Sequence, residues 1–309
     1  MTPRYRLATA DANGTSSVYI EHLGLLLPLA ALLDEAGLER LGGSPPQDLM
    51  PLLQDWSYWR DTLPELLSKL TPAQKKTGVR PQDARFRPPV IRPGKLICIG
   101  ANYHDHIQEM KIPMLPTYPY SFLKPPSTTL RGSGETVMVP AIAKMLDWEA
   151  ELAVIIGARA FRQPLAQALD VVAGYANLND LSARDWLANS PGVGVDWVRH
   201  KAFDGFAPMG PYMLPAEFVP NPQSLPVKLS VNGVIKQNSN TAQMVFGVAQ
   251  IIEYLTEIMT LEPGDIIATG TPAGTGYGQK PQQFLQPGDV VRIEIDDLGV
   301  LETPIIQPS

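Results

Sequence analysis

The sequence predicts a mixed α/β protein that is rich in β-structure, with a small N-terminal α+β domain ahead of a larger main body. Short runs of Val, Ile and Leu alternate with Gly and Pro turns through the main body, which is the pattern of strands joined by tight loops. Helical periodicity is limited to a few segments. A polar, Pro-rich stretch at 76–94 separates the two parts and is interpreted as a connector. We therefore expect residues 1–75 to form the small domain and residues 95–309 to form the main one.

The small N-terminal domain is expected to contain two strands followed by two helical segments. A turn at Asn13-Gly14 would join the strands. The two helical segments show apolar residues at helical spacing. In order, these elements are predicted at 4–10, 16–22, 25–41 and 46–70.

The main body is expected to consist mostly of strands. Runs of β-branched residues bounded by Gly or Pro predict strands at 95–99, 136–139, 150–156, 171–178, 226–231, 265–269 and 289–295. Apolar periodicity predicts helices at 103–110, 164–170 and 244–260.

Composition and charge exclude several classes of function. Of the 309 residues, 44% are hydrophobic and 18% are charged, which is globular composition. The net charge of −6 is spread along the chain, and no basic cluster offers a surface for nucleic acid or for an anionic membrane. The single cysteine, Cys98, permits no disulfide within the chain, and residues 1–14 lack the apolar stretch of a signal peptide. We expect a cytoplasmic protein with no nucleic-acid or membrane partner.

Three acidic residues are candidate metal ligands. Glu149 and Glu151 are two apart at the start of a predicted strand and so share a face, where a cation would relieve their repulsion. Asp180 stands where another predicted strand stops. Three carboxylates with open positions suit Mg²⁺ or Mn²⁺. A solvated strand face for the two glutamates and a helix N-cap for Asp180 are the structural alternatives.

A histidine and a glutamate form a candidate acid–base pair. His106 and Glu109 are three apart on the predicted helix at 103–110 and so lie on one face. A carboxylate beside an imidazole orients it and raises its basicity, as a general base requires. Both could equally be solvated residues of a surface helix. A zinc site at His104 and His106 is a weaker interpretation, since they are two apart and no cysteine pair accompanies them.

A Gly- and Thr-rich loop follows the predicted strand at 265–269. It lacks the Lys-Ser/Thr ending of a phosphate-binding P-loop. Its backbone could cradle a carboxylate, or it could be a plain tight turn.

Together these segments make the chain resemble the fumarylacetoacetate hydrolase superfamily, in its fumarylacetoacetase and acylpyruvase-like branch. The resemblance runs from Lys95 to Ile305. The segments that carry it occur in the family's order: Asn-Tyr-x-Asp-His-x-x-Glu at 102–109, Phe-Leu-Lys-Pro at 122–125, Asp-x-Glu-x-Glu at 147–151, Asn-Asp-x-Ser-Ala-Arg-Asp at 179–185, Lys-x-Phe-Asp at 201–204, Val-Asn-Gly at 231–233, and Pro-Gly-Asp-x-Ile-Ala-Thr-Gly-Thr-Pro-x-Gly at 263–274.

The resemblance implies a β-roll catalytic domain, a homodimer and roles for nine residues. It implies Mg²⁺, or else Mn²⁺ or Ca²⁺, as the cofactor. The metal ligands would be Glu149, Glu151 and Asp180; the catalytic residues His106, Glu109 and Lys201; and the substrate-binding residues Thr271, Lys124 and Arg184. Lys124 and Arg184 could instead support the site.

The implied activity is that of a hydrolase acting on carbon–carbon bonds in ketonic substances. The substrate would be a small diketo acid, either an acylpyruvate or a relative of fumarylacetoacetate, cleaved through a metal-stabilised enolate. An isomerase or decarboxylase acting on a related 2-oxo acid uses the same enolate chemistry and remains open, as does a non-catalytic β-rich binding protein. Two departures from the family pattern, Leu187 and the stretch 189–200, lie near the expected substrate pocket.

Overall fold

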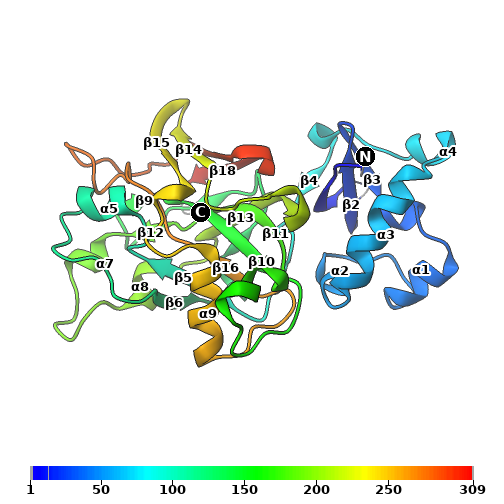
Figure 1. Ribbon diagram of the computed structural model, residues 1–309. Coiled ribbons are helices and arrows are strands. Elements are labelled where there is room, and N and C mark those ends of the chain that lie inside the picture. The colour runs from blue at the N-terminus through cyan, green and yellow to red at the C-terminus, as the bar shows by residue number, and fades with distance from the viewer. Residues whose placement is uncertain (1–2, 13, 308–309) are drawn as a thin grey trace.

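The structure, a computed structural model, describes residues 3–12 and 14–307. Its strands form three sheets (Figure 1). The largest runs in the order β3 (Leu25–Pro28), β2 (Ser16–His22), β1 (Arg6–Asp11), β13 (Ala207–Pro215), β11 (Val172–Asn179), β10 (Ala150–Ile156), β16 (Ile266–Ala268), β5 (Leu96–Gly100) and β6 (Tyr120–Lys124), with β4 (Arg85–Phe86) beside β1 and β7 (Leu130–Arg131) beside β13. The second runs β15 (Val234–Asn240), β14 (Pro226–Val231), β17 (Val290–Ile295), β18 (Val300–Ile306) and β8 (Val137–Met138), and the third pairs β12 (Ser182–Ala183) with β9 (Leu146–Asp147).

Helices are short and lie around the sheets. They are α1 (Glu35–Arg40), α2 (Met50–Leu53), α3 (Trp56–Ser68), α4 (Pro72–Lys75), α5 (His104–Glu109), α6 (Pro126–Thr129), α7 (Asp185–Ala188), α8 (Trp197–Lys201) and α9 (Val248–Ile258). Short 3-10 helices are η1 (Leu29–Ala31), η2 (Pro81–Asp83), η3 (Leu165–Val171), η4 (Ala216–Phe218), η5 (Thr241–Gln243) and η6 (Asp296–Leu298). In the part of the chain that the structure describes, none of these helices has the length and apolarity needed to cross a bilayer.

Strand β10 shows how the core is divided. All seven of its residues are buried, and alternate side chains enter two different clusters. Leu152 and Val154 pack with residues of the second sheet such as Ile293, whereas Ala153 and Ile155 pack in the cluster that contains Trp59 of α3. Because β10 is covered on both faces, it is a rigid base for the acidic residues at its start.

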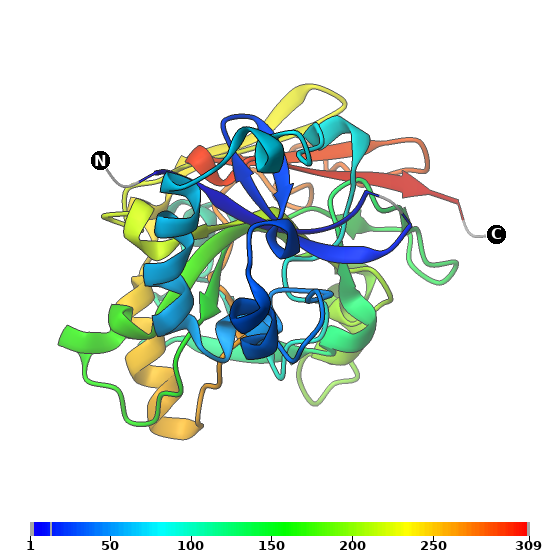
Figure 2. The same ribbon diagram turned by 90° about the vertical axis from the view of Figure 1, so that its right-hand side faces the viewer.

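The N-terminal segment is grouped on one side of the molecule and faces the viewer in Figure 2. It is nonetheless joined to the main body, because β1 pairs with β13 at Leu7↔Met213 and the cluster around Trp59 also contains residues of β10 and β11. The division into a small domain, a connector at 76–94 and a catalytic domain therefore stays a prediction.

The mixed α/β, sheet-rich fold is confirmed, and one element prediction is wrong. Residues 25–41 are not one helix, because 25–28 pair with β2 as strand β3 and only Glu35–Arg40 is α-helical. The helix predicted at 164–170 is present at Leu165–Val171, as the 3-10 helix η3 and not as an α-helix. The predicted turn residue Asn13 lies outside the described residues.

Candidate metal centre

Glu149, Glu151 and Asp180 converge at one end of the pair β10–β11. Strand β10 begins at Ala150 and β11 ends at Asn179, and these two residues are paired. The Asp180 backbone N–H donates to the Glu149 carbonyl at 2.9 Å, which ties the two loop residues together. One ligand atom from each of the three carboxylates lies within 4.8 Å of the others, and all three residues are buried. They do not lie on a solvated strand face, and Asp180 caps no helix.

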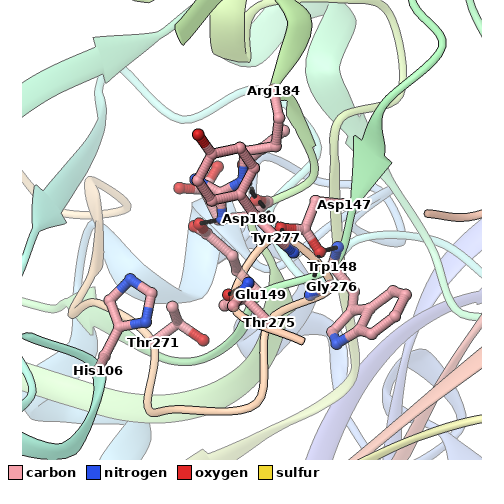
Figure 3. A network of polar contacts seen from close by, with 12 residues as sticks. His106, Asp147, Trp148, Glu149, Asp180, Arg184, Thr271, Thr275, Gly276 and Tyr277 are labelled. Atoms are coloured by element: carbon pink, nitrogen blue, oxygen red, sulfur yellow. Dashed lines mark hydrogen bonds and ion pairs between the residues drawn. The ribbon is translucent and has the colours of Figure 1, made fainter. Parts of the chain in front are cut away.

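Two cationic side chains contact these acids, Lys201 from α8 and Arg184 from the position just before α7. Lys201 Nζ lies 2.6 Å from Glu149 Oε2 and 2.6 Å from Asp180 Oδ2. Arg184 donates from Nη2 to Glu149 Oε1 and from Nε to Asp147 Oδ2, the latter at 2.8 Å (Figure 3). Burial alone would lower the pKa of Lys201, but Asp180 and Glu149 raise it above its ordinary value, so its ammonium is held charged.

Lys124 lies behind Asp180, away from the cavity. Its buried ammonium donates to Asp180 Oδ1 and to the carbonyls of Leu181 and Phe206. With Lys201 it outweighs the effect of burial and lowers the pKa of Asp180 to about 2. All three donors of the ammonium are used, so these contacts favour support of Asp180 over the substrate contact predicted for Lys124.

Glu151 is the acid without a cationic partner. Its Oε2 accepts the backbone N–H of Gly270 at 2.8 Å, and within the described residues no cation lies at ion-pair distance from it. Burial, followed by the charges of Asp180 and Glu149, raises its pKa well above the ordinary range. A buried carboxylate of this kind beside two others is the donor set expected for a hard divalent cation, so the residues fit Mg²⁺ or Mn²⁺.

Asp147 is a buried acid to which the sequence assigned no role. It accepts Arg184 Nε and the backbone N–H groups of Gly276 and Tyr277, at 2.6 Å and 3.1 Å (Figure 3). It therefore fixes Arg184 against the loop that follows β16. The sequence feature that could have identified Asp147 as a site residue is its position two residues before Glu149 in the Asp-x-Glu-x-Glu pattern.

The predicted pair His106 and Glu109 is present on α5. His106 Nδ1 lies 3.4 Å from Glu109 Oε2, and Glu109 also accepts the backbone N–H of Gly274 at 2.9 Å. Burial tends to raise the pKa of Glu109, but the hydrogen bonds from His106 and Gly274 lower it overall, so the group is ionised. The imidazole lies beside Thr271 (Figure 3).

Helix α5 is anchored to the body. Asn102, just before it, donates to the carbonyls of Thr269 and Phe246 at 2.8 Å and 3.0 Å. Asp105 accepts the Ser239 hydroxyl at 2.6 Å. His106 is buried and Glu109 is partly buried, so the alternative of a solvated surface helix does not hold for this pair. The stretch 112–118 that follows is mostly exposed.

The loop after β16 is held by Gln237, a residue that the sequence did not single out. Gln237 is buried in β15, donates to Thr271 Oγ1 and to the Pro272 carbonyl, both at 2.8 Å, and accepts the Ala150 N–H at 2.9 Å. It thereby connects the loop to the start of β10. The loop approaches β15 so closely that a Cβ at Gly274 would lie 2.0 Å from the Lys236 carbonyl oxygen, which only glycine avoids.

A cavity of about 220 Å³ lies between these elements. It is lined by the three acids and by Lys201, Arg184, His106 and Thr271, together with apolar side chains. A larger hollow of about 500 Å³ beside Arg87 and Arg131 lacks the acidic triad. The structure thus gathers eight of the nine predicted site residues around one cavity or, for Glu109, directly behind it.

Comparison with known proteins assigns the family. Residues 95–306 match the family described as Fumarylacetoacetate (FAA) hydrolase C-terminal. The chain belongs to this family. It is 41% identical over 218 residues to oxaloacetate tautomerase fahd2 of Xenopus laevis, a match that covers 71% of this chain and 67% of the relative. It is 40% identical over 221 residues to the Rattus norvegicus protein Fahd2a of the same description, covering 72% and 69%.

Solved structures share the fold over nearly the whole chain. Fumarylacetoacetate hydrolase from Exiguobacterium antarcticum superposes with a TM-score of 0.78 at 29% identity, covering 98% of this chain and 100% of that one. Maleylpyruvate hydrolase from Sphingobium sp. SYK-6, in complex with manganese(II) and pyruvate, gives 0.76 at 28% identity with the same coverage. The family match and the buried acidic triad support a metal-dependent enzyme of the fumarylacetoacetate hydrolase type.

Proposed function

We propose that this protein is a divalent-metal-dependent hydrolase that cleaves a carbon–carbon bond in a small diketo acid of the acylpyruvate type. The observation that carries the proposal is that His106, paired with Glu109, lines the same cavity as Glu149, Glu151 and Asp180. A non-catalytic binding protein has no need of a buried acidic triad beside an imidazole–carboxylate pair.

In this proposal, Glu149, Glu151 and Asp180 would hold Mg²⁺ or Mn²⁺. The bound cation supplies Lewis-acid stabilisation of negative charge on the oxygens of a 2-oxo acid. Thr271, on the loop held by Gln237, lines the cavity and would contact the substrate carboxylate.

In this proposal, His106 and Glu109 of α5 activate the attacking water. Glu109 holds the proton of His106 on Nδ1, which leaves Nε2 free to accept a proton from water. The hydroxide adds to the distal carbonyl carbon, the bond between that carbonyl and the neighbouring methylene breaks, and its electron pair passes to the pyruvate unit as an enolate. The ammonium of Lys201 stabilises this charge, and the proton held on His106 completes the products, pyruvate and a carboxylic acid.

A second candidate is an isomerase, tautomerase or decarboxylase on a related 2-oxo acid. The relatives named as oxaloacetate tautomerases favour it, as does the solved structure of a probable 2-hydroxyhepta-2,4-diene-1,7-dioate isomerase from Mycobacterium abscessus, which shares the fold. Proton transfer alone requires no activated water, so the two candidates differ in their need for His106.

The experiment is His106→Ala, assayed with 2,4-dioxopentanoate and Mg²⁺. We expect hydrolysis to fall by roughly 10²–10⁴-fold while metal affinity is kept. His104→Ala is the matched control, because His104 is exposed on the same helix. Loss of metal binding in His106→Ala would make His106 a ligand. Full hydrolysis by that variant would rule out His106 as the base that activates water. No hydrolysis by the wild type, together with rapid keto–enol exchange, would favour the second candidate.

We also propose a cytoplasmic location for this protein, whereas the Xenopus and Rattus relatives are named as mitochondrial proteins.

A further inference from the structure

The cavity beside the triad is lined by two chemically different sets of side chains, called here its two walls. One wall carries the three acids with Lys201, Arg184, His106 and Thr271. The other is made by the side chains of Met110, Ile112, Tyr120, Phe122, Leu187 and Trp197. Lys201 Nζ of the first wall lies 5.6 Å from the centre of the Phe122 ring of the second, so the far end of a substrate whose 2-oxo-acid end lies at the triad has these apolar side chains within reach.

The apolar wall is an ordered aromatic cluster. Trp197 of α8 stacks on Phe122 of β6, with ring centroids 4.6 Å apart, and meets Tyr120 edge-on at 5.5 Å. Lys201 Nζ lies 5.6 Å from the centre of the Phe122 ring, so Phe122 marks the point where the charged wall meets the apolar one. Such a packed surface gains affinity by covering apolar atoms.

The cations that line the cavity are already engaged. Arg184 is shared between Asp147 and Glu149, and Lys201 between Glu149 and Asp180. In the described part of the chain, the second wall offers only the Tyr120 hydroxyl as a polar side chain besides the Trp197 indole N–H. A carboxylate placed there would lose its hydration without gaining a positive partner.

We propose that the substrate of this enzyme is a monocarboxylic 2-oxo acid whose far end is an apolar alkyl or aryl group, and that a dicarboxylic acid of the same length is rejected. This inference rests on the proposed function, whose site it uses, and gives that function a substrate class. Tyr120, Phe122 and Trp197 are its specificity-determining residues.

Binding provides the first test, because it does not depend on which reaction follows. The holoenzyme with Mn²⁺ is titrated with 2-oxohexanoate and with 2-oxohexanedioate, which have equal chain lengths and differ only at the last carbon. We expect the monocarboxylate to bind more tightly by about 100-fold. Shortening it to 2-oxobutanoate should weaken binding by about fourfold for each methylene removed.

Turnover provides the second test, with 2,4-dioxoheptanoate and 2,4-dioxoheptanedioate as the matched pair. We expect kcat/KM to favour the monocarboxylate by the same order as binding does. If neither diketo acid is cleaved while the binding preference stands, the hydrolase proposal fails and the substrate class survives. Equal or tighter binding of the dicarboxylate overturns the inference, whatever the reaction.

Two lysine substitutions test whether the apolar wall causes the preference for 2-oxohexanoate over 2-oxohexanedioate. Ile112→Lys places a cation on the apolar wall at a residue that is 39% exposed, so the fold should tolerate it. We expect it to reduce the preference for 2-oxohexanoate at least tenfold. Met114→Lys is the matched control, because Met114 is 77% exposed and does not line this cavity, and it should leave the preference unchanged. An equal effect of both variants would mean that general charge, and not this wall, sets the selectivity.

Discussion

Lys201 Nζ lies 2.6 Å from Asp180 Oδ2, inside a group of buried carboxylates. The same ammonium contacts Glu149 Oε2, so one lysine neutralises two of the three candidate metal ligands. The Lys201 ammonium therefore partly neutralises the site when no metal ion is bound. The charge of the third candidate ligand, Glu151, would be neutralised only when a metal ion binds.

Lys201→Met should destabilise the protein mainly when metal is removed. In chelator, Glu149 and Asp180 lose a buried partner, and we expect about 3–5 kcal/mol less stability towards urea. With excess Mg²⁺ the loss should shrink, because the ion takes over part of the neutralisation. Lys228→Met, at an exposed lysine of β14, is the control and should change stability by less than about 0.5 kcal/mol. Equal losses with and without Mg²⁺ would argue against a cation at the triad.

His200 should make stability sensitive to acid. It is only 1% exposed, and burial, followed by the charges of Lys201 and Arg184, lowers its pKa to about 2. In the unfolded chain the His200 imidazole takes up a proton near pH 6.5, whereas in the folded chain it stays neutral. Its contribution to the free energy of unfolding is therefore fully present above pH 6.5 and is lost as pH falls towards 2.

The measurement is urea unfolding of the wild type and His200→Leu at two values of pH. When pH is lowered from 7 to 5, the free energy of unfolding of the wild type should fall by about 2 kcal/mol more than that of the variant. The same loss in both proteins would mean that His200 does not remain neutral in the folded state.

The stretch 112–118 should be mobile without ligand. It follows α5, its residues are mostly exposed, and Ile112 reaches the cavity. We expect its amides to exchange hydrogen rapidly in the free protein and more slowly with Mn²⁺ and a 2-oxo acid, while the amides of β10 stay protected in both. Unchanged exchange in 112–118 on ligand binding would exclude a closing movement.

The homodimer implied by the family resemblance is also open to test. Light scattering at micromolar concentration should give about twice the mass of 33.7 kDa. A monomer throughout that range would contradict it.

The sequence was most informative where side-chain chemistry repeats at a fixed spacing. Glu149 and Glu151 two apart, and His106 and Glu109 three apart, predicted shared faces, and the structure places each pair together. The helix period places His106 and Glu109 on one face of α5. Glu149 lies just before β10, and it is held beside Glu151 by the hydrogen bond from the Asp180 backbone N–H to its carbonyl.

It was least informative where distant segments meet. Gln237 contacts Thr271 and Ala150 only because β15 crosses near β10, which no local pattern records. Strand β13 was missed because Pro208 and Pro211 argue against a central strand, yet it lies between β1 and β11, where its pairing with β11 shifts register. The strand β3 was read as helix because an apolar run as short as 25–28 has no period of its own.

Calorimetric titration of chelator-treated protein with Mn²⁺ would detect a divalent cation held by Glu149, Glu151 and Asp180. The raised pKa of Glu151 means that its proton must leave when the ion binds, so the heat should depend on the buffer's ionisation enthalpy. For the wild type we predict one Mn²⁺ site per chain, with release of a proton on binding. For Glu151→Gln we predict an Mn²⁺ affinity at least about 100-fold weaker and no proton release from this residue. Glu65→Gln, at an exposed glutamate of α3, should behave as the wild type. Unchanged affinity in Glu151→Gln would contradict the account.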